Sequence, residues 1–218
     1  MKIELLKPLE KIPYFTISGF KQVLNAKEED NQRVRETLWR WVKKGHVIRL
    51  KKGVYMTRQF YELHQSDVSF RPAVSTILLP QSYVSLEYVL QRAGVLTDVT
   101  YPITAVTQKN TKRINNVLGT FIYRHIKPMF YNGFNQGSLY GMVFNQATVA
   151  KALFDYFYLR PIPRHLRTKK TILTEELRLN LGEITLEGRD EFKKYIEMSE
   201  SPKMMFVYKN LRKTIWQP

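Results

Sequence analysis

The stretch NQRVRETLWRWVKKGHVIRLKKGVYMT, residues 31–57, decides how the N-terminal part of this chain folds. Its first half carries Val34, Leu38 and Trp41 at intervals of four and three residues. At 100° per residue these side chains share one face, which predicts an amphipathic helix that packs on a core.

The second half of the stretch has the pattern of a β-hairpin. We expect Asn31 to cap the helix, which runs to Lys44, and Gly45 to end it. Two apolar runs, residues 46–50 and 54–57, then flank the short basic turn KKG.

A shorter helix is expected before this one. Residues 15–18 offer an N-cap for a helix that ends near residues 24–25, and a polar turn at 27–30 joins the two helices. Helix, turn, helix and a hairpin with a basic tip is the order of a winged helix-turn-helix. We therefore predict a DNA-binding domain over residues 1–60.

The exposed face of the longer helix suggests which side chains contact DNA. The N-terminal half of such a helix enters the major groove, where Arg matches guanine and Gln matches adenine with two hydrogen bonds each. We predict base contacts by Gln32, Arg33 and Glu36. Basic side chains suit phosphates, and this second set is Arg40, Lys43, Lys44, Lys51 and Lys52. The same pattern is also typical of a charged helix face that only meets water.

The charge of the chain supports a polyanionic partner. The 218 residues include 35 Lys and Arg against 19 Asp and Glu, a net charge of +16, and half of this excess lies in residues 1–60. Cysteine is absent, so disulfides and Cys-based metal sites are excluded. A charged N-terminus and the lack of a long apolar run predict a cytoplasmic protein that has no membrane partner.

Residues 61–72 are polar without clear periodicity, and we expect a linker there, followed by a larger domain over residues 73–218. Mixed secondary structure is predicted for this body. The expected helices are 74–79, 85–93, 147–159, 174–180, 187–199 and 203–215, and the expected strands are 103–107, 120–125 and 139–144.

The body lacks a catalytic pattern. Its histidines are widely spaced, no Walker or dinucleotide-binding glycine motif occurs, and the serine of GSLYG at 137–141 is one position away from a nucleophile elbow. We therefore expect no enzyme activity, no catalytic residues, no metal site and no cofactor.

Three stretches resemble the AbiEi-type antitoxins of bacterial abortive-infection toxin–antitoxin systems. They are residues 38–55, LWRWVKKGHVIRLKKGVY; residues 83–90, YVSLEYVL, with Gly94; and residues 147–155, ATVAKALFD, with YLRP at 158–161. The chain departs from the family pattern at Val149 and Ala150, where relatives have Pro and Glu, and at Tyr88, where a small residue is common.

The resemblance implies an α+β protein with an N-terminal winged helix-turn-helix, then a larger mixed α/β antitoxin domain with a helical C-terminus. It implies autorepression through inverted repeats in double-stranded operator DNA, by a monomer or weak dimer that binds cooperatively. It also implies neutralisation, direct or indirect, of a co-encoded nucleotidyltransferase-like toxin. On the matching motifs, antitoxin-domain function is expected at Ser85, Lys151, Asp155 and Arg160.

Two other functions stay open from the sequence. One is a winged-helix repressor without antitoxin activity, whose body senses a ligand or self-associates. The other is a nucleic-acid enzyme or accessory factor. Such a protein would bind RNA or DNA through a basic run, which consists of Arg160, Arg164, Arg167, Lys169 and Lys170.

Overall fold

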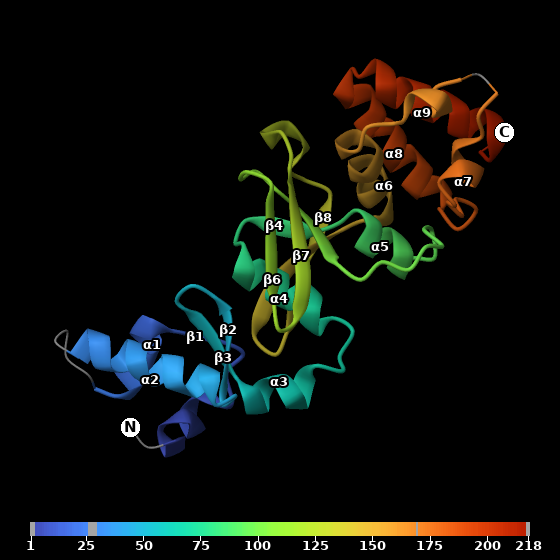
Figure 1. Cartoon of the computed structure of the whole chain (residues 1–218). Helices are drawn as coiled ribbons and strands as arrows, with labels where there is room; N and C mark the ends of the chain where they lie inside the picture. Colours follow the sequence, from blue (N-terminus) through green and yellow to red (C-terminus); the bar gives the residue numbers. More distant parts are fainter. Residues whose placement is uncertain (1–2, 26–29, 169, 217–218) are drawn as a thin grey trace. The chain divides into compact units, whose positions relative to one another are not determined.

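The computed structural model describes residues 3–25, 30–168 and 170–216 and combines helices with two β-sheets (Figure 1). The expected mixture of α and β structure is confirmed. The turn expected at 27–30 lies, except for Asp30, outside the described residues, as does Lys169.

The chain divides into two compact units, which are described separately. Unit 1 comprises Met1–Pro80, Ile114–Thr120 and Ser138–Val143. Unit 2 comprises Gln81–Arg113, Phe121–Gly137 and Phe144–Pro218.

Unit 1 begins with short elements and one long helix. Its elements are η1 (Ile3–Leu9), β1 (Phe15–Thr16), α1 (Ile17–Val23), α2 (Asn31–Lys43), β2 (Val47–Lys51), β3 (Val54–Thr57), α3 (Arg58–His64) and α4 (Phe70–Leu78). The three strands form an antiparallel sheet in the order β1-β3-β2.

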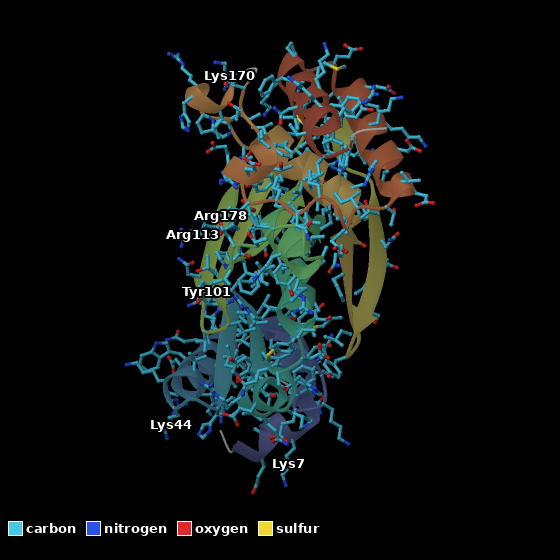
Figure 2. All side chains as sticks on the ribbon, turned by 90° about the vertical axis from the view of Figure 1, so that its right-hand side faces the viewer. Lys7, Lys44, Tyr101, Arg113, Lys170 and Arg178 are labelled. Carbon is cyan, nitrogen blue, oxygen red and sulfur yellow. The ribbon has the colours of Figure 1, made fainter. Side chains whose placement is uncertain are left out.

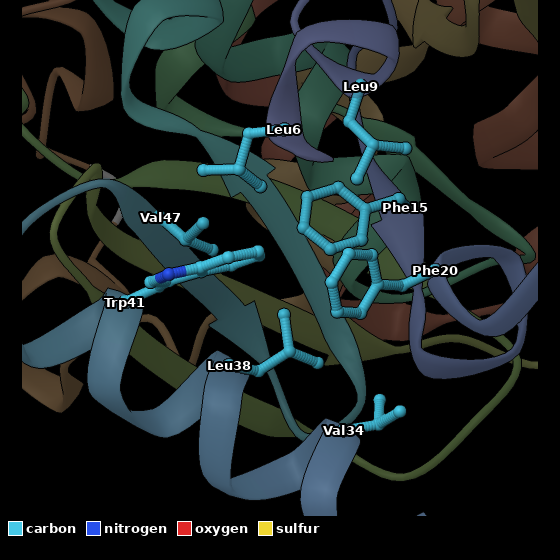
Figure 3. Packing of buried hydrophobic residues seen from close by; sticks show 8 residues of the cluster. All are labelled: Leu6, Leu9, Phe15, Phe20, Val34, Leu38, Trp41 and Val47. Atoms are coloured by element: carbon cyan, nitrogen blue, oxygen red, sulfur yellow. The ribbon is translucent and has the colours of Figure 1, made fainter. Parts of the chain in front are cut away.

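The core of unit 1 lies under the apolar face of α2. Val34, Leu38 and Trp41 are all buried, as the helical spacing predicts, and Trp41 meets Phe20 of α1 edge-on at 5.4 Å between ring centroids (Figure 3). Leu6 of η1 joins the same cluster. Burying this face stabilises α2 more than helix propensity does.

The ends of α2 differ slightly from the prediction. Its N-cap is Asp30, and Asn31 is already helical. At the other end Gly45 adopts φ +78°, and the amide of His46 donates to the Trp41 carbonyl at 2.9 Å. The predicted stop is confirmed, because glycine tolerates this left-handed conformation.

The segment predicted as a linker, residues 61–72, has regular structure over most of its length. The prediction missed α3 and the first turn of α4 because the helical residues within this segment, 61–64 and 70–72, are too few to show a helical period. Phe60 and Phe70 are both buried, with ring centroids 6.3 Å apart. Their burial holds the two helices in unit 1.

Unit 2 combines a mixed sheet with a group of helices, whose later members run from orange to red in Figure 1. The sheet, of which residues 114–116, 119–120, 138–139 and 142–143 are assigned to unit 1, has the order β6-β7-β5-β4-β9-β8. The strands are β4 (Ser82–Val84), β5 (Ile103–Thr107), β6 (Lys112–Asn116), β7 (Gly119–His125), β8 (Phe134–Leu139) and β9 (Met142–Ala147). The helices are α5 (Glu87–Arg92), η3 (Pro128–Phe130), α6 (Val149–Leu159), η4 (Arg164–Leu166), α7 (Leu173–Glu176), α8 (Leu186–Ser199) and α9 (Pro202–Thr214).

Several expected elements of the body are corrected. The strand expected at 139–144 is interrupted, because Leu139 ends β8 and β9 begins at Met142. Between them Tyr140 and Gly141 have φ of +50° and +77°, the conformation of a two-residue hairpin turn. The helix expected from residue 85 begins at Glu87, because Ser82–Val84 pairs as β4. Strands β6 and β8 were not predicted, since neither shows apolar alternation.

Candidate functional site

The solvent-exposed face of α2 carries the side chains predicted to contact DNA. Gln32, Arg33, Glu36, Arg40, Lys43 and Lys44 are all exposed. The amide nitrogen of Gln32 donates to Glu36 Oε1 at 3.0 Å, so these two side chains orient each other. Arg40 is held more loosely, with a guanidinium nitrogen 3.4 Å from the hydroxyl of Thr37. The face therefore presents two arginines beside an ordered amide–carboxylate pair.

A hollow of about 620 Å³ lies between α2 and the β2–β3 hairpin. Its apolar lining residues include Ile17, Val42 and Tyr55. Its cationic lining residues are Arg35, Arg49 and Lys52. An apolar lining with three cations against one carboxylate, Glu36, suits a sugar–phosphate strand, whose phosphates are anionic.

Trp39 borders this hollow and was not among the side chains predicted to contact DNA. Its side chain is 58 % exposed, unlike Trp41, and the Lys43 ammonium lies 4.1 Å from the centroid of its ring. Arg35 lies one helical turn before Trp39, and Arg49 follows two buried strand residues. That spacing in the sequence was the signal that could have identified both arginines.

The structure corrects the prediction for Lys51. Its ammonium donates to the carbonyl oxygens of Ile77 at 2.7 Å and Leu78 at 3.0 Å, at the C-terminal end of α4. Lys51 thus satisfies carbonyls that the helix end leaves unpaired. Lys52, at the exposed turn before Gly53, remains as the hairpin cation that can meet a phosphate.

Unit 2 contains a buried ionic network at α6. Lys151 and Asp155 are one helical turn apart, both have no exposed surface, and the ammonium donates to Asp155 Oδ1. The other carboxylate oxygen, Oδ2, accepts from Ser85 at 2.8 Å and from Tyr83 at 2.9 Å. Three donors therefore converge on one carboxylate.

Aromatic rings surround the buried ammonium. Lys151 Nζ lies 5.4, 5.0 and 5.2 Å from the ring centroids of Tyr83, Phe154 and Tyr195. Burial lowers the pKa of Lys151 and raises that of Asp155, while their attraction opposes both shifts. Burial and the adjacent Asp155 raise the pKa of the Tyr83 hydroxyl, so that hydroxyl remains a donor.

Of the four residues expected from the antitoxin resemblance, the structure brings three together. Ser85, Lys151 and Asp155 share the network, whereas Arg160 is exposed. Its guanidinium pairs with Glu87 at 3.4 Å and lies 4.6 Å from the Tyr156 ring centroid.

Sequence reasoning missed three members of this region. Tyr83 lies in β4, Tyr195 on α8, and Glu191 accepts from the Thr148 hydroxyl at 2.7 Å. They lie far from Lys151 in the sequence, so no local pattern connects them. Because Ser85, Lys151 and Asp155 are closed to solvent, the network joins β4 to α6 and does not present a reactive group at the surface.

Neither a candidate metal cluster nor a candidate membrane-spanning helix occurs among residues 3–25, 30–168 and 170–216. Within these ranges no group of three or more His, Cys, Asp or Glu side chains could hold a metal ion. No helix there is both long and apolar enough to cross a bilayer. In the basic run after α6, Arg167 donates to the Ile162 carbonyl at 2.8 Å, and Arg164 and Lys170 are exposed.

The sequence matches no family model and no curated protein.

Proposed function

We propose that this chain is a cytoplasmic antitoxin that represses its own promoter and neutralises a co-encoded nucleotidyltransferase-like toxin. In this proposal residues 1–60 form a winged helix, α2 enters the major groove of double-stranded operator DNA, and the β2–β3 turn lies over the neighbouring backbone. The protein binds inverted repeats cooperatively, as a monomer or weak dimer, and uses no cofactor, metal or catalytic residue.

The observation that carries the DNA-binding half is the concentration of cations on one surface of unit 1. Arg33 and Arg40 project from the exposed face of α2. Arg35, Arg49 and Lys52 line the hollow between this helix and the hairpin. The strand order β1-β3-β2 and the two helices before the hairpin support the winged-helix interpretation.

The proposed antitoxin activity is supported by the resemblance to the AbiEi-type antitoxins and by the contact between two of the matching stretches. The second and third matching stretches contribute Ser85 and the Lys151–Asp155 pair to one buried network. This supports the view that the two stretches form one structural unit.

Charge reversal at Arg33 and Arg40 tests the DNA-binding half. The variant Arg33→Glu/Arg40→Glu should bind a duplex from the chain's own promoter at least about 100-fold more weakly, because it loses base and phosphate contacts and adds repulsion. Lys52→Ala should instead weaken operator and unrelated duplexes alike. Fluorescence anisotropy on both duplexes measures these effects.

Lys7→Glu/Lys11→Glu is the matched control for the same change in net charge. Both lysines are exposed, and the neighbouring Leu6 and Leu9 pack into the core beneath the buried face of α2. This control should keep its preference for the promoter duplex. An equal loss in both charge-reversed variants would rule out α2 as the reader.

Growth rescue tests the antitoxin half. The adjacent gene is induced alone, with the full-length protein, and with the Arg33→Glu/Arg40→Glu variant. We expect both proteins to restore growth, because neutralisation does not need the operator. Toxicity that persists with well-expressed protein would leave the repressor without antitoxin activity as the better function.

A further inference from the structure

A basic cluster occupies one end of the sheet in unit 2, apart from every residue assigned above. Residues 99–154 contain no Asp or Glu. The only buried Lys or Arg in that segment is Lys151. The remaining cations are exposed, and with His125 they make up the basic cluster: Lys109, Lys112, Arg113, Arg124, His125 and Lys127.

Strand pairing brings these residues to one edge of the sheet. Strands β5 and β7 run parallel, with Thr107 opposite His125, so both end at the same edge of the sheet. The backbone amide of His125 donates to Thr111 Oγ1 at 3.1 Å, which ties the end of β7 to the loop before β6. Its Nδ1 lies 3.1 Å and 3.2 Å from the carbonyl oxygens of Gln108 and Lys109.

The same contacts make the cluster an ordered surface. Strand β6 begins at Lys112 and neighbours β7, which places the first residues of one strand beside the last residues of the other. The Ile126 amide donates to the Thr107 carbonyl at 2.9 Å and holds the chain that leads to Lys127. Arg113 is labelled at the outer side of the ribbon in Figure 2.

The chemistry of the cluster favours phosphates over a protein surface. Its cations are interspersed with the hydrogen-bonding side chains of Gln108, Asn110 and Thr111, all exposed. Lys, Arg, Gln, Asn and Thr are the residues that contact nucleic-acid phosphates. The centre of a protein–protein interface is depleted of charge and needs aromatic or apolar anchors, which the cluster does not contain.

We propose that this basic cluster is a second nucleic-acid surface, which binds the phosphodiester backbone without reading its sequence. It goes beyond the proposed winged helix, because it lies in unit 2 and shares no residue with α2 or its hairpin. Each phosphate contact releases counterions, so the cluster contributes a salt-dependent part of the affinity.

The test removes three of these charges in the full-length protein. The variant Lys112→Gln/Arg113→Gln/Lys127→Gln is compared with Lys193→Gln/Lys194→Gln/Lys209→Gln, which loses three exposed charges from α8 and α9. Each set is also placed in the Arg33→Glu/Arg40→Glu background, which removes the proposed α2 contacts. Melting curves check that every variant is folded.

Binding is measured by anisotropy over a series of salt concentrations. The probes are an unrelated DNA duplex, a duplex RNA and a single-stranded RNA of equal length. On duplex DNA the cluster variant should reduce the slope of log K against log salt by about 2.7, since each phosphate contact contributes about 0.9. The α8–α9 variant should leave this slope unchanged.

The experiment tests the proposed α2 surface and the basic cluster independently. Residual binding in the Arg33→Glu/Arg40→Glu background that disappears with the cluster variant supports the second surface, and the most affected probe identifies its nucleic acid. Equal slopes for the cluster and α8–α9 variants on every probe would overturn it. Loss of toxin neutralisation without any change in nucleic-acid binding would also overturn it and assign the cluster to an acidic protein.

Discussion

Asp155→Ala is expected to lower the free energy of unfolding by about 3–5 kcal/mol, the usual cost of removing one partner from a buried ion pair. The Lys151 ammonium would lose its only carboxylate partner within hydrogen-bond distance among the described residues, in a site closed to solvent. The hydroxyls of Tyr83 and Ser85 would lose their common acceptor. Urea denaturation followed by circular dichroism measures the loss.

Two further variants separate the effect of breaking the Lys151–Asp155 ion pair from the effect of removing a carboxylate. Asp190→Ala removes an exposed carboxylate on α8 and should change stability by less than about 0.5 kcal/mol. Lys151→Met/Asp155→Leu removes both charges and keeps apolar volume, so it should cost less than Asp155→Ala alone. A double variant that is less stable than Asp155→Ala would show that the charges themselves hold the fold.

Gly133→Ala is expected to be the second severe substitution, at about 2–5 kcal/mol, from a strained backbone and an overpacked core. Gly133 has φ +73°. A Cβ there would overlap the Tyr195 hydroxyl and lie 3.0 Å from Cγ and Cδ of Lys151. The glycine therefore leaves the space that the buried lysine stem occupies.

Gly141→Ala is the matched control, because it has a similar φ of +77° and nothing within 4 Å of its added Cβ. It should cost only the backbone strain, about 1–2 kcal/mol. Adding Tyr195→Phe to Gly133→Ala removes the overlapping hydroxyl and should recover part of the stability. Equal losses at the two glycines would contradict a packing role for Gly133.

The elements predicted well are those whose pattern is complete within a few residues. Helix α2 and the β2–β3 hairpin follow from apolar spacing at 3.6 residues, a glycine stop and a basic turn. Strand β6 has no such pattern, because an edge strand with the sequence KRINN buries little. The linker prediction failed for a related reason, because the burial of Phe60 and Phe70 depends on tertiary packing.

The candidate sites divide in the same way. The sequence by itself determined that Lys151 and Asp155 share a helix face and that Gln32, Glu36 and Arg40 share another, because i,i+4 spacing is a property of the helix. Only the tertiary structure decided that Lys51 binds the carbonyls ending α4 and that Tyr83 and Tyr195 enclose Lys151. These partners lie 26 to 68 residues apart, and their meeting depends on strand pairing and helix packing, which no local spacing encodes.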